Sequence, residues 1–377
     1  MKKILTSTAL VGSLAFLSAG ISNAQTTVTG NLAMSYKATS TDQSTTAAKT
    51  ANLRSFGKES QINLTHTNKL SNGMGLVAGF SLEFDGSDAN QANITATGNA
   101  TNSFRGVTNE NTYIDIIAGN TTFTFGADHM QNPDNTVTNL VGVADQDDII
   151  SGIGGSTTTL YSPGKNSAYQ AYQFGITQTT PIGKISLGYA PDSTTGQANS
   201  DTQGYGSANG LANYDVDESR YEIGFVGNLG VKDLTVQLFY NKEDNAGRKS
   251  LDGSKSSDQK GMMLATRYNL GTVALAYERG ETTSTSAIEN KSNSFGVSFA
   301  ASKEITLGAN YTKTDTDRTV ANSTLGAANA DEKIKSVSVG YNLGPIVVGL
   351  SYGEVDGYNG VSGVDGKAVR IDTNVKF

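Results

Sequence analysis

Several things that this 377-residue sequence lacks already limit what it does. It contains no cysteine, which excludes disulfide frameworks, thiol nucleophiles and thiolate metal sites together. Beyond residue 24 no apolar run approaches the ~20 residues that a membrane-spanning helix needs, so a bundle of membrane helices is excluded. Charged residues make up 17%, below the ~25% of a typical soluble domain. The net charge of −7 argues against a nucleic-acid partner.

Glycine and aromatic residues are the abundant classes. The chain has 43 Gly, 16 Tyr and 13 Phe, but its hydrophobic fraction of 37% is low for a protein of this length that buries one large core. This composition is typical of short strands joined by many loops. The length alone allows two or three ordinary domains or one large β architecture.

The first 24 residues have the pattern of a secretory signal peptide. Lys2 and Lys3 precede an apolar stretch over residues 4–17, and Ala24 closes a small-residue cleavage site before Gln25. The predicted mature chain is therefore 25–377, with 26 basic and 35 acidic residues and a net charge of −9. We expect the protein to be exported.

Period-two alternation of apolar and polar residues recurs from end to end of the mature chain. For example, Leu234, Val236, Leu238 and Tyr240 share one parity and alternate with a more polar set. Since successive side chains of a strand point to opposite faces, each segment has one apolar face and one polar face. The alternation predicts sixteen strands, over residues 27–37, 58–70, 74–84, 109–118, 121–128, 168–178, 182–190, 218–228, 231–242, 259–269, 272–280, 292–300, 303–313, 332–342, 345–355 and 367–377.

The connections between these strands alternate strictly between short and long. The short ones include Asn72-Gly73 and Gly119-Asn120, steps that suit tight hairpins because both residue types tolerate positive φ. A soluble sandwich has no reason to keep this rhythm. Inside lipid every backbone polar group needs a partner, so a spanning sheet must close on itself. The pattern predicts a sixteen-stranded antiparallel transmembrane β-barrel with a polar lumen and both termini on the short-turn side.

Aromatic residues at the strand ends are typical of the two girdles of such barrels at the lipid–water boundaries. Outward-parity residues close the strands that run away from the short turns, namely Tyr36, Tyr189, Tyr240, Tyr277, Tyr311 and Tyr352. The strands that run back end on Tyr268, Phe299, Tyr341 and Phe377.

The last strand, residues 368–377, ends the chain on Phe377. It resembles the C-terminal strand of Gram-negative outer-membrane proteins, and residues 73–84 resemble the second hairpin of the general bacterial porins. With its signal peptide, strand number and length, the whole chain resembles that family. The resemblance implies an outer-membrane homotrimer, surrounded by lipid and lipopolysaccharide, with short periplasmic turns and long extracellular loops. It also implies passive diffusion of small hydrophilic solutes and ions, and recognition of Phe377 by the barrel-assembly machinery.

The resemblance further implies that the third long connection, residues 129–167, folds into the barrel and narrows it. This connection has no Pro-Glu-Phe-Gly-Gly turn, which is common in the family, and it carries one base, Lys165. Its acids are Asp134, Asp145, Asp147 and Asp148. In the family such acids commonly face a wall of bases across the constriction.

Parity predicts which bases lie on the lumen side of the wall: Lys37, Lys184, Arg220, Arg267 and Arg370. Arg54 has the position of a family wall base, but its parity matches Ile62 and Leu64, so a bulge would be needed to turn it inward. We expect these residues to line the pore and the acids to give a mild cation preference. The alternative is that they are ordinary solvated charges.

Other functions find weak support. His66 is expected to face the membrane boundary, and His129 beside Asp128 forms a catalytic scheme of little specificity without a nucleophile motif. Residues 145–148 lack the spacing and glycine of a calcium loop. We therefore predict no enzyme, no metal and no cofactor. A substrate-selective channel is the main alternative, and a hydrolase barrel or an adhesin has less support. An adhesin built of repeats needs a repeat of fixed length, and none is visible in the sequence.

Overall fold

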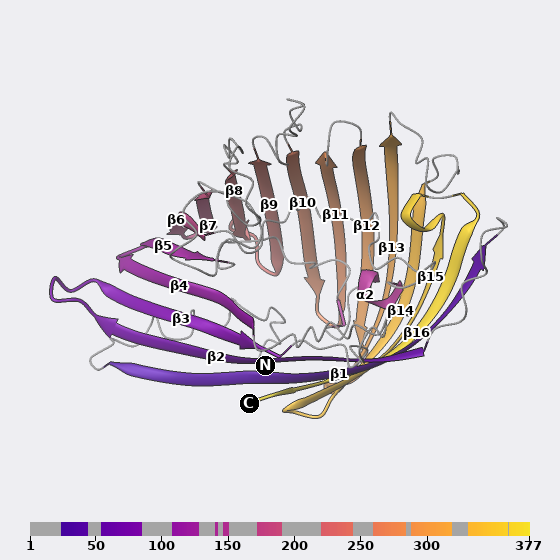
Figure 1. Cartoon of the computed structure of the whole chain (residues 1–377), viewed down its shortest axis with the longest axis horizontal. Coiled ribbons are helices and arrows are strands. Elements are labelled where there is room, and N and C mark those ends of the chain that lie inside the picture. Colours follow the sequence, from indigo (N-terminus) through magenta and orange to yellow (C-terminus); the bar gives the residue numbers. More distant parts are fainter. Residues whose placement is uncertain are drawn as a thin grey trace, which may run out of the picture.

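Sixteen antiparallel strands close into a single barrel in the computed structural model of the chain (Figure 1). The structure describes residues 24–43, 54–84, 108–127, 140–141, 146–150, 172–190, 220–243, 259–283, 288–318, 331–360 and 362–377. The strands are β1 (Gln25–Gln43), β2 (Arg54–Lys69), β3 (Gly75–Glu83), β4 (Thr108–Ala118), β5 (Thr121–Ala127), β6 (Tyr172–Thr180), β7 (Gly183–Ala190), β8 (Arg220–Gly227), β9 (Leu234–Glu243), β10 (Gln259–Leu270), β11 (Val273–Thr283), β12 (Ile288–Ala300), β13 (Ile305–Arg318), β14 (Glu332–Asn342), β15 (Ile346–Asp356) and β16 (Val364–Lys376).

The predicted strand number, order and antiparallel pairing are confirmed. Each strand pairs with its neighbours in the sequence, and β1 also pairs with β16. The largest differences are extensions on the long-connection side, where β1 continues to Gln43 and β13 to Arg318. The short turns contain glycines at positive φ, including Gly73 at 86° and Gly119 at 63°, as the turn residues predict.

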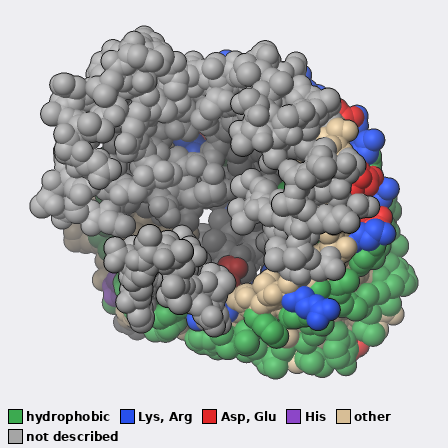
Figure 2. All heavy atoms as spheres, turned by 45° about the vertical axis from the view of Figure 1, so that its right-hand side comes forward, with side chains coloured by type: hydrophobic (Ala, Val, Ile, Leu, Met, Phe, Trp, Pro, Cys, Tyr) green, Lys and Arg blue, Asp and Glu red, His purple; other side chains and the backbone are tan. Residues whose placement is uncertain are grey.

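The barrel has an apolar outer face and a mostly polar inner face. In β14 the side chains of Val337, Val339 and Tyr341 are exposed, whereas those of Ser336 and Ser338 are buried on the opposite face. Figure 2 shows the exposed apolar side chains as a belt on the barrel wall, with charged side chains above it. The low hydrophobic fraction of the sequence therefore reflects one apolar face per strand around a hollow interior.

The aromatic strand ends lie on the outer face, as predicted. Tyr240 and Tyr352 are exposed at the long-connection side, and Tyr268 and Tyr341 are exposed at the short-turn side. Neighbouring rings also pack on one another, with 5.0 Å between the ring centres of Tyr277 and Phe295. Aromatic side chains thus border the apolar belt on both sides.

The C-terminal residue completes the closure between β16 and β1. The backbone N–H of Gly30 donates to the carbonyl of Phe377 at 2.9 Å, and the N–H of Phe377 donates to the carbonyl of Gly30 at 3.0 Å. A Cβ atom on Gly30 would lie 2.6 Å from the Phe377 ring, so the ring lies across a residue without a side chain. Phe377 itself stays 67% exposed on the outer face.

Within the described residues, two short helical segments accompany the strands: α2 (Gln146–Ile150) and the 3₁₀ helix η2 (Tyr358–Gly360). The alternation analysis did not predict α2, because five residues are too few to show a helical period. Within the described ranges, no helix is long and apolar enough to span a membrane. Helix α2 contacts β14, β15 and β16, which places part of the third long connection inside the barrel (Figure 1).

Candidate functional site

The lumen is the candidate site, and two described pieces of the third long connection, residues 140–141 and 146–150, lie against its wall. Leu140 packs with Phe239 of β9, with Met263 and Ala265 of β10, and with Ala276 of β11, all on the inner face. Val141 lies against Gly308 of β13 and Gly340 of β14. A Cβ atom on Gly340 would lie 2.6 Å from the Val141 side chain, so Val141 can pack this closely only against a glycine at position 340.

Gln146 ties the start of α2 to the wall by hydrogen bonds. Its side chain is fully buried, and its Nε2 donates to the carbonyls of Asn310 and Ile334, both at 3.3 Å. The Thr312 hydroxyl donates to Gln146 Oε1 at 2.5 Å. Because a buried amide is costly unless its polar atoms are bonded, these contacts favour one position of α2 on β13 and β14.

Ile149 and Ile150 form the apolar part of the α2 attachment. Both side chains are fully buried, and they share one face of the helix with Gln146 because the three are spaced i, i+3 and i+4. They pack in a cluster inside the barrel with Ile334, Val355, Tyr358, Val364 and Ala368. A Cβ atom on Gly353 of β15 would lie 2.8 Å from Ile149, so the helix approaches the wall closely there.

These contacts refine the expectation of a uniformly polar lumen. The inner face is apolar where the third connection rests on it, at positions such as Ile334 and Met263. The sequence does contain a signal for this attachment, since Leu140-Val141 and Ile149-Ile150 are apolar pairs within a polar connection. The charges of that segment, which were the basis of the expectation, did not reveal it.

The five bases that parity assigned to the lumen all lie on the inner face. Arg220 and Glu222 form a buried pair with a 3.4 Å separation between Nη2 and Oε2. Arg370 Nε donates to Asp372 Oδ1 at 2.6 Å, and Lys37 lies directly opposite Arg370 in the β1–β16 ladder. Arg267 Nε donates to Asn269 Oδ1 at 3.3 Å. Lys184 lies on the inner face of β7, next to Ser186.

Arg54 is placed differently from the other bases. The β1–β2 register runs unbroken from Ala38↔Arg54 to Gln25↔Thr67, so the strand has no bulge there that would turn the side chain. Arg54 therefore keeps the parity of Ile62 and Leu64 and lies on the outer face. This corrects its assignment to the pore lining.

Acidic residues on the same wall were missed by the sequence analysis. In β4 and β5, for example, the Thr124 hydroxyl donates to Asp115 Oδ1 at 2.6 Å on the inner face. The parity that located the bases would have located these acids as well, because they occupy the same inward positions. They are Glu59, Glu83, Asp115, Glu222, Glu278, Glu332 and Asp372.

The acids of the third connection are described only in part. Asp147 and Asp148 are residues of α2, and the position of this helix places their backbone inside the barrel. Their side chains lie outside the described residues, as do Asp134, Asp145 and Lys165. Their role at the constriction stays a prediction.

The histidines and the acids were also candidates for catalysis or metal binding. Thr26 Oγ1 and His66 Nδ1 lie 3.0 Å apart on the outer face, in agreement with the expected membrane-boundary position of His66. His129 and Asp128 lie outside the described residues. The described part of the chain has no group of three or more His, Asp or Glu residues that could hold a metal ion.

Comparison with known proteins decides the family. A family model described as Gram-negative porin matches residues 6–374. This chain is a Gram-negative porin. It is accordingly a passive channel of the outer membrane, with short periplasmic turns and long extracellular loops, and membership of this family favours a channel over an enzyme.

Solved porin and channel structures share the fold of this porin at low sequence identity. An anion-selective porin from Comamonas acidovorans is similar with a TM-score of 0.61 and 13% identity, over 94% of this chain and 100% of that chain. The outer-membrane channel DcaP of Acinetobacter baumannii gives 0.57 and 12%, over 94% and 98%. The trimer form of OmpT from Vibrio cholerae gives 0.56 and 12%, over 94% and 99%. The comparison with curated proteins finds no match.

Proposed function

We propose that this porin is a general channel for small hydrophilic solutes and ions, with a mild cation preference, and that its third extracellular connection forms the constriction. The attachment of residues 140–141 and 146–150 to the inner wall supports this proposal more than any other observation. A channel wide enough for hydrated solutes discriminates by its narrowest section and by the charges around it. The mechanism is sieving with electrostatics and contains no covalent step, so the porin needs no cofactor.

The charge of the third connection is proposed to set the sign of the preference. Around the described lumen wall, acids accompany the bases, as in the pairs Arg220–Glu222 and Arg370–Asp372. Acid and base partly cancel there, whereas the third connection has four aspartates and one lysine. Asp147 and Asp148 directly follow Gln146, which is anchored to the wall, and we propose that they supply the decisive negative charge.

Reversal potentials in a KCl gradient test this assignment. We expect the wild-type porin in a planar bilayer to prefer K⁺, and Asp147→Asn with Asp148→Asn to reduce that preference and change the single-channel conductance. Asp356→Asn on the outer face is the matched control and should leave both unchanged. An anion preference of the wild type would contradict the proposed selectivity, and an unchanged double variant would remove Asp147 and Asp148 from the constriction.

Liposome swelling separates a general channel from a substrate-selective one. A general channel admits small neutral sugars in the order of their size, because it sieves them. If one sugar entered much faster than smaller ones, the substrate-selective alternative would replace the proposal.

The assembly partners are part of the same proposal. We infer a homotrimer in contact with outer-membrane lipid and lipopolysaccharide, delivered after cleavage of the predicted signal peptide at 1–24 and recognised by the barrel-assembly machinery through Phe377. The exposed ring of Phe377 at the end of β16 supports the last point. Chemical cross-linking in native membranes should give a ladder that ends at three chains, and Phe377→Ala should lower the amount of assembled barrel.

A further inference from the structure

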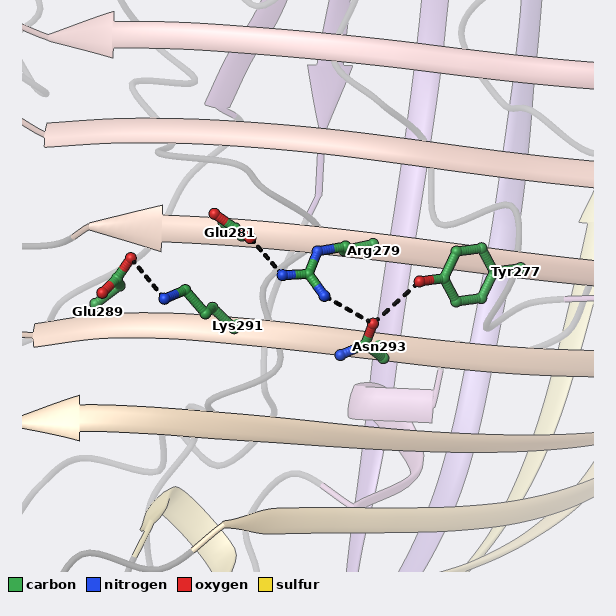
Figure 3. Close-up of polar contacts among 6 residues, drawn as sticks. All are labelled: Tyr277, Arg279, Glu281, Glu289, Lys291 and Asn293. Carbon is green, nitrogen blue, oxygen red and sulfur yellow. Dashed lines mark hydrogen bonds and ion pairs between the residues drawn. The ribbon is translucent and has the colours of Figure 1, made fainter.

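The extracellular ends of β11 and β12 are polar on both faces of the wall. In Figure 3, the outward Arg279 lies between Glu281 and Asn293, and its Nη2 donates to Glu281 Oε1 at 2.6 Å. On the inner face, the side chains of Thr282 and Ser292 are buried. This part of the wall agrees with the expectation of a polar lumen, and it is the reference for β14–β16.

At the extracellular ends of β14–β16 the inner face is apolar instead. The outward side chains are charged there, as on β11 and β12, and include Lys333, Glu354 and Lys367. The inward positions between them hold the buried residues Ile334, Val355, Val364 and Ala368. An apolar surface is unfavourable in contact with the water of a lumen, so this surface is suited to packing against another apolar element.

Tyr358 of the eighth long connection, residues 357–363, packs on this apolar surface. If β15 continued, Tyr358 would point outward like Tyr352 of the same strand. Gly357 ends the strand instead, because its φ of 66° lies in the left-handed region that favours glycine. The Gly357 N–H donates to Asp365 Oδ1 at 2.9 Å, which stabilises the turn. The Tyr358 side chain therefore lies inside the barrel and is only 2% exposed.

Tyr358 and helix α2 belong to one cluster of buried apolar side chains. Helix α2 contacts β14, β15 and β16, and η2, which begins at Tyr358, contacts β14 and β16. We call this set the α2 cluster; it consists of Ile149, Ile150, Ile334, Val355, Tyr358, Val364 and Ala368. A helix of five residues is too short to be stable by itself in water, so α2 depends on these contacts. Tyr358 has the largest side chain of the cluster.

We propose that Tyr358 is a positioning residue of the pore constriction: its ring completes the α2 cluster and thereby keeps α2 on the wall. The proposal rests on the proposed function of the third connection as the constriction. The eighth connection is thus a second extracellular connection that determines the width of the pore. Tyr358 acts through packing in the α2 cluster and not through contact with a passing solute.

Thiol labelling of single cysteines in the folded porin tests the effect on α2, since the chain has no cysteine of its own. Ile149→Cys places a buried thiol in the α2 cluster, and Leu140→Cys places one in the separate cluster on β9–β11. Loss of a buried ring commonly costs several times the free energy of a tenfold change, so Tyr358→Ala should accelerate labelling at position 149 at least roughly tenfold. Labelling at position 140 should change less than about twofold, because the two clusters share no residue.

Single-channel conductance tests the effect on the pore. Tyr358→Ala should raise the conductance towards that of Ile149→Glu with Ile150→Glu, which removes the apolar attachment of α2 directly. Tyr358→Phe keeps the ring and should give the wild-type conductance. Tyr352→Ala, at an exposed position on the outer face of β15, is the matched control and should equal the wild type as well.

A disulfide formed by Gly353→Cys with Ile149→Cys distinguishes positioning from general damage to the barrel. In the Tyr358→Ala background, oxidation should return the conductance to that of the same disulfide variant with Tyr358 intact. The reason is that the link replaces the ring in holding α2 on β15. A barrel that had merely lost stability would not recover.

The role of Tyr358 and the proposed constriction fail on different results. Unchanged labelling at position 149, equal acceleration at positions 140 and 149, or no recovery with the disulfide would each overturn the role of Tyr358. The constriction requires a changed conductance of Ile149→Glu with Ile150→Glu, in which Tyr358 is intact. If that pair changed the conductance and Tyr358→Ala did not, the constriction would stand and Tyr358 would have no part in it.

Discussion

Strands β9–β16 and strands β3–β8 differ on both faces of the barrel wall. On the inner face, β9–β16 carries the apolar and hydrogen-bonding positions that residues 140–141 and 146–150 contact, including those for Gln146 and Ile149. On the outer face, β9–β16 carries charged side chains such as Lys313, Lys333 and Glu354, whereas the described outward side chains of β3–β8 include no charged residue. Both groups of strands therefore show the same period-two alternation but carry different residues on their inner and outer faces.

Strand length explains part of this difference. β12 and β13 have 13 and 14 residues, whereas β5 and β7 have 7 and 8. At ~3.3 Å per residue, the longer strands extend well beyond an apolar belt of ~25 Å even when they are tilted. Their last residues reach the headgroup region, where charged side chains are stable.

The largest expected effect comes from removing the apolar attachment of α2. Ile149→Glu with Ile150→Glu places charge among Ile334, Val355 and Tyr358 and removes burial that contributes roughly 3 to 6 kcal/mol. We expect the third connection to leave the wall and the single-channel conductance to increase.

Ile149→Val is the control for this experiment, because it keeps an apolar side chain at a cost of about 0.5–1.5 kcal/mol. Its conductance should match the wild type. If the double glutamate variant also kept the wild-type conductance, the attachment of α2 would not affect the pore. The inner faces of β9–β16 and β3–β8 would then not differ in this respect.

A smaller effect is expected from the buried amide. Gln146→Leu leaves the Thr312 hydroxyl and two wall carbonyls without this partner, which should lower the free energy of unfolding by about 1–3 kcal/mol. In the other group of strands, β3–β8, Gln178 is exposed on β6 and accepts a hydrogen bond from the Thr121 hydroxyl at 2.7 Å. Gln178→Leu should change stability by less than about 0.5 kcal/mol. Urea unfolding in detergent measures the free energy of unfolding of both variants. Equal losses would show that the buried Gln146 contributes no more to stability than the exposed Gln178.

The smallest effect concerns the ion pair of Lys313 and Asp331 on the outer face. Lys313 Nζ lies 3.0 Å from Asp331 Oδ2, and this hydrogen bond holds the pKa of the Asp331 carboxyl below its ordinary value. A lowered carboxyl pKa stabilises the fold above the ordinary pKa, and the contribution is lost as the pH falls through the lowered value. Lys313→Met should therefore lower stability at neutral pH by at most about 1 kcal/mol.

Thermal unfolding of the Lys313→Met variant and the wild type at several pH values measures this contribution. The difference between them should shrink as Asp331 becomes protonated in acid. A difference that stayed constant down to the most acid pH would show that Lys313 acts through packing and not through charge.

The sequence predicts the barrel well because its alternation is a local property. Each strand shows its own parity, so Val337 and Ser338 could be assigned to opposite faces without knowing the neighbouring strands. The same parity places Lys37 and Arg370 inside. The inward acids, such as Asp115, follow from this rule once it is applied to both signs of charge.

The position of the third connection could not be predicted in the same way. The contact of Val141 with Gly308 and Gly340 joins residues more than 160 positions apart, and the five residues of α2 carry no periodic signal. Only the folded barrel brings those glycines to one place. The charge of the segment and its apolar pairs were both present in the sequence, but the sequence did not show which wall residues those pairs contact.

An engineered disulfide tests most directly whether the third connection stays on the β15 wall while the porin conducts. A Cβ atom on Gly353 would lie 3.7 Å from the Cβ of Ile149, close to the ~3.8 Å of disulfides, and the porin has no cysteine of its own. Gly353→Cys with Ile149→Cys should therefore cross-link on oxidation, and the oxidised channel should keep the wild-type single-channel conductance. Failure to cross-link in the folded barrel, or a changed conductance once the link has formed, would contradict this account.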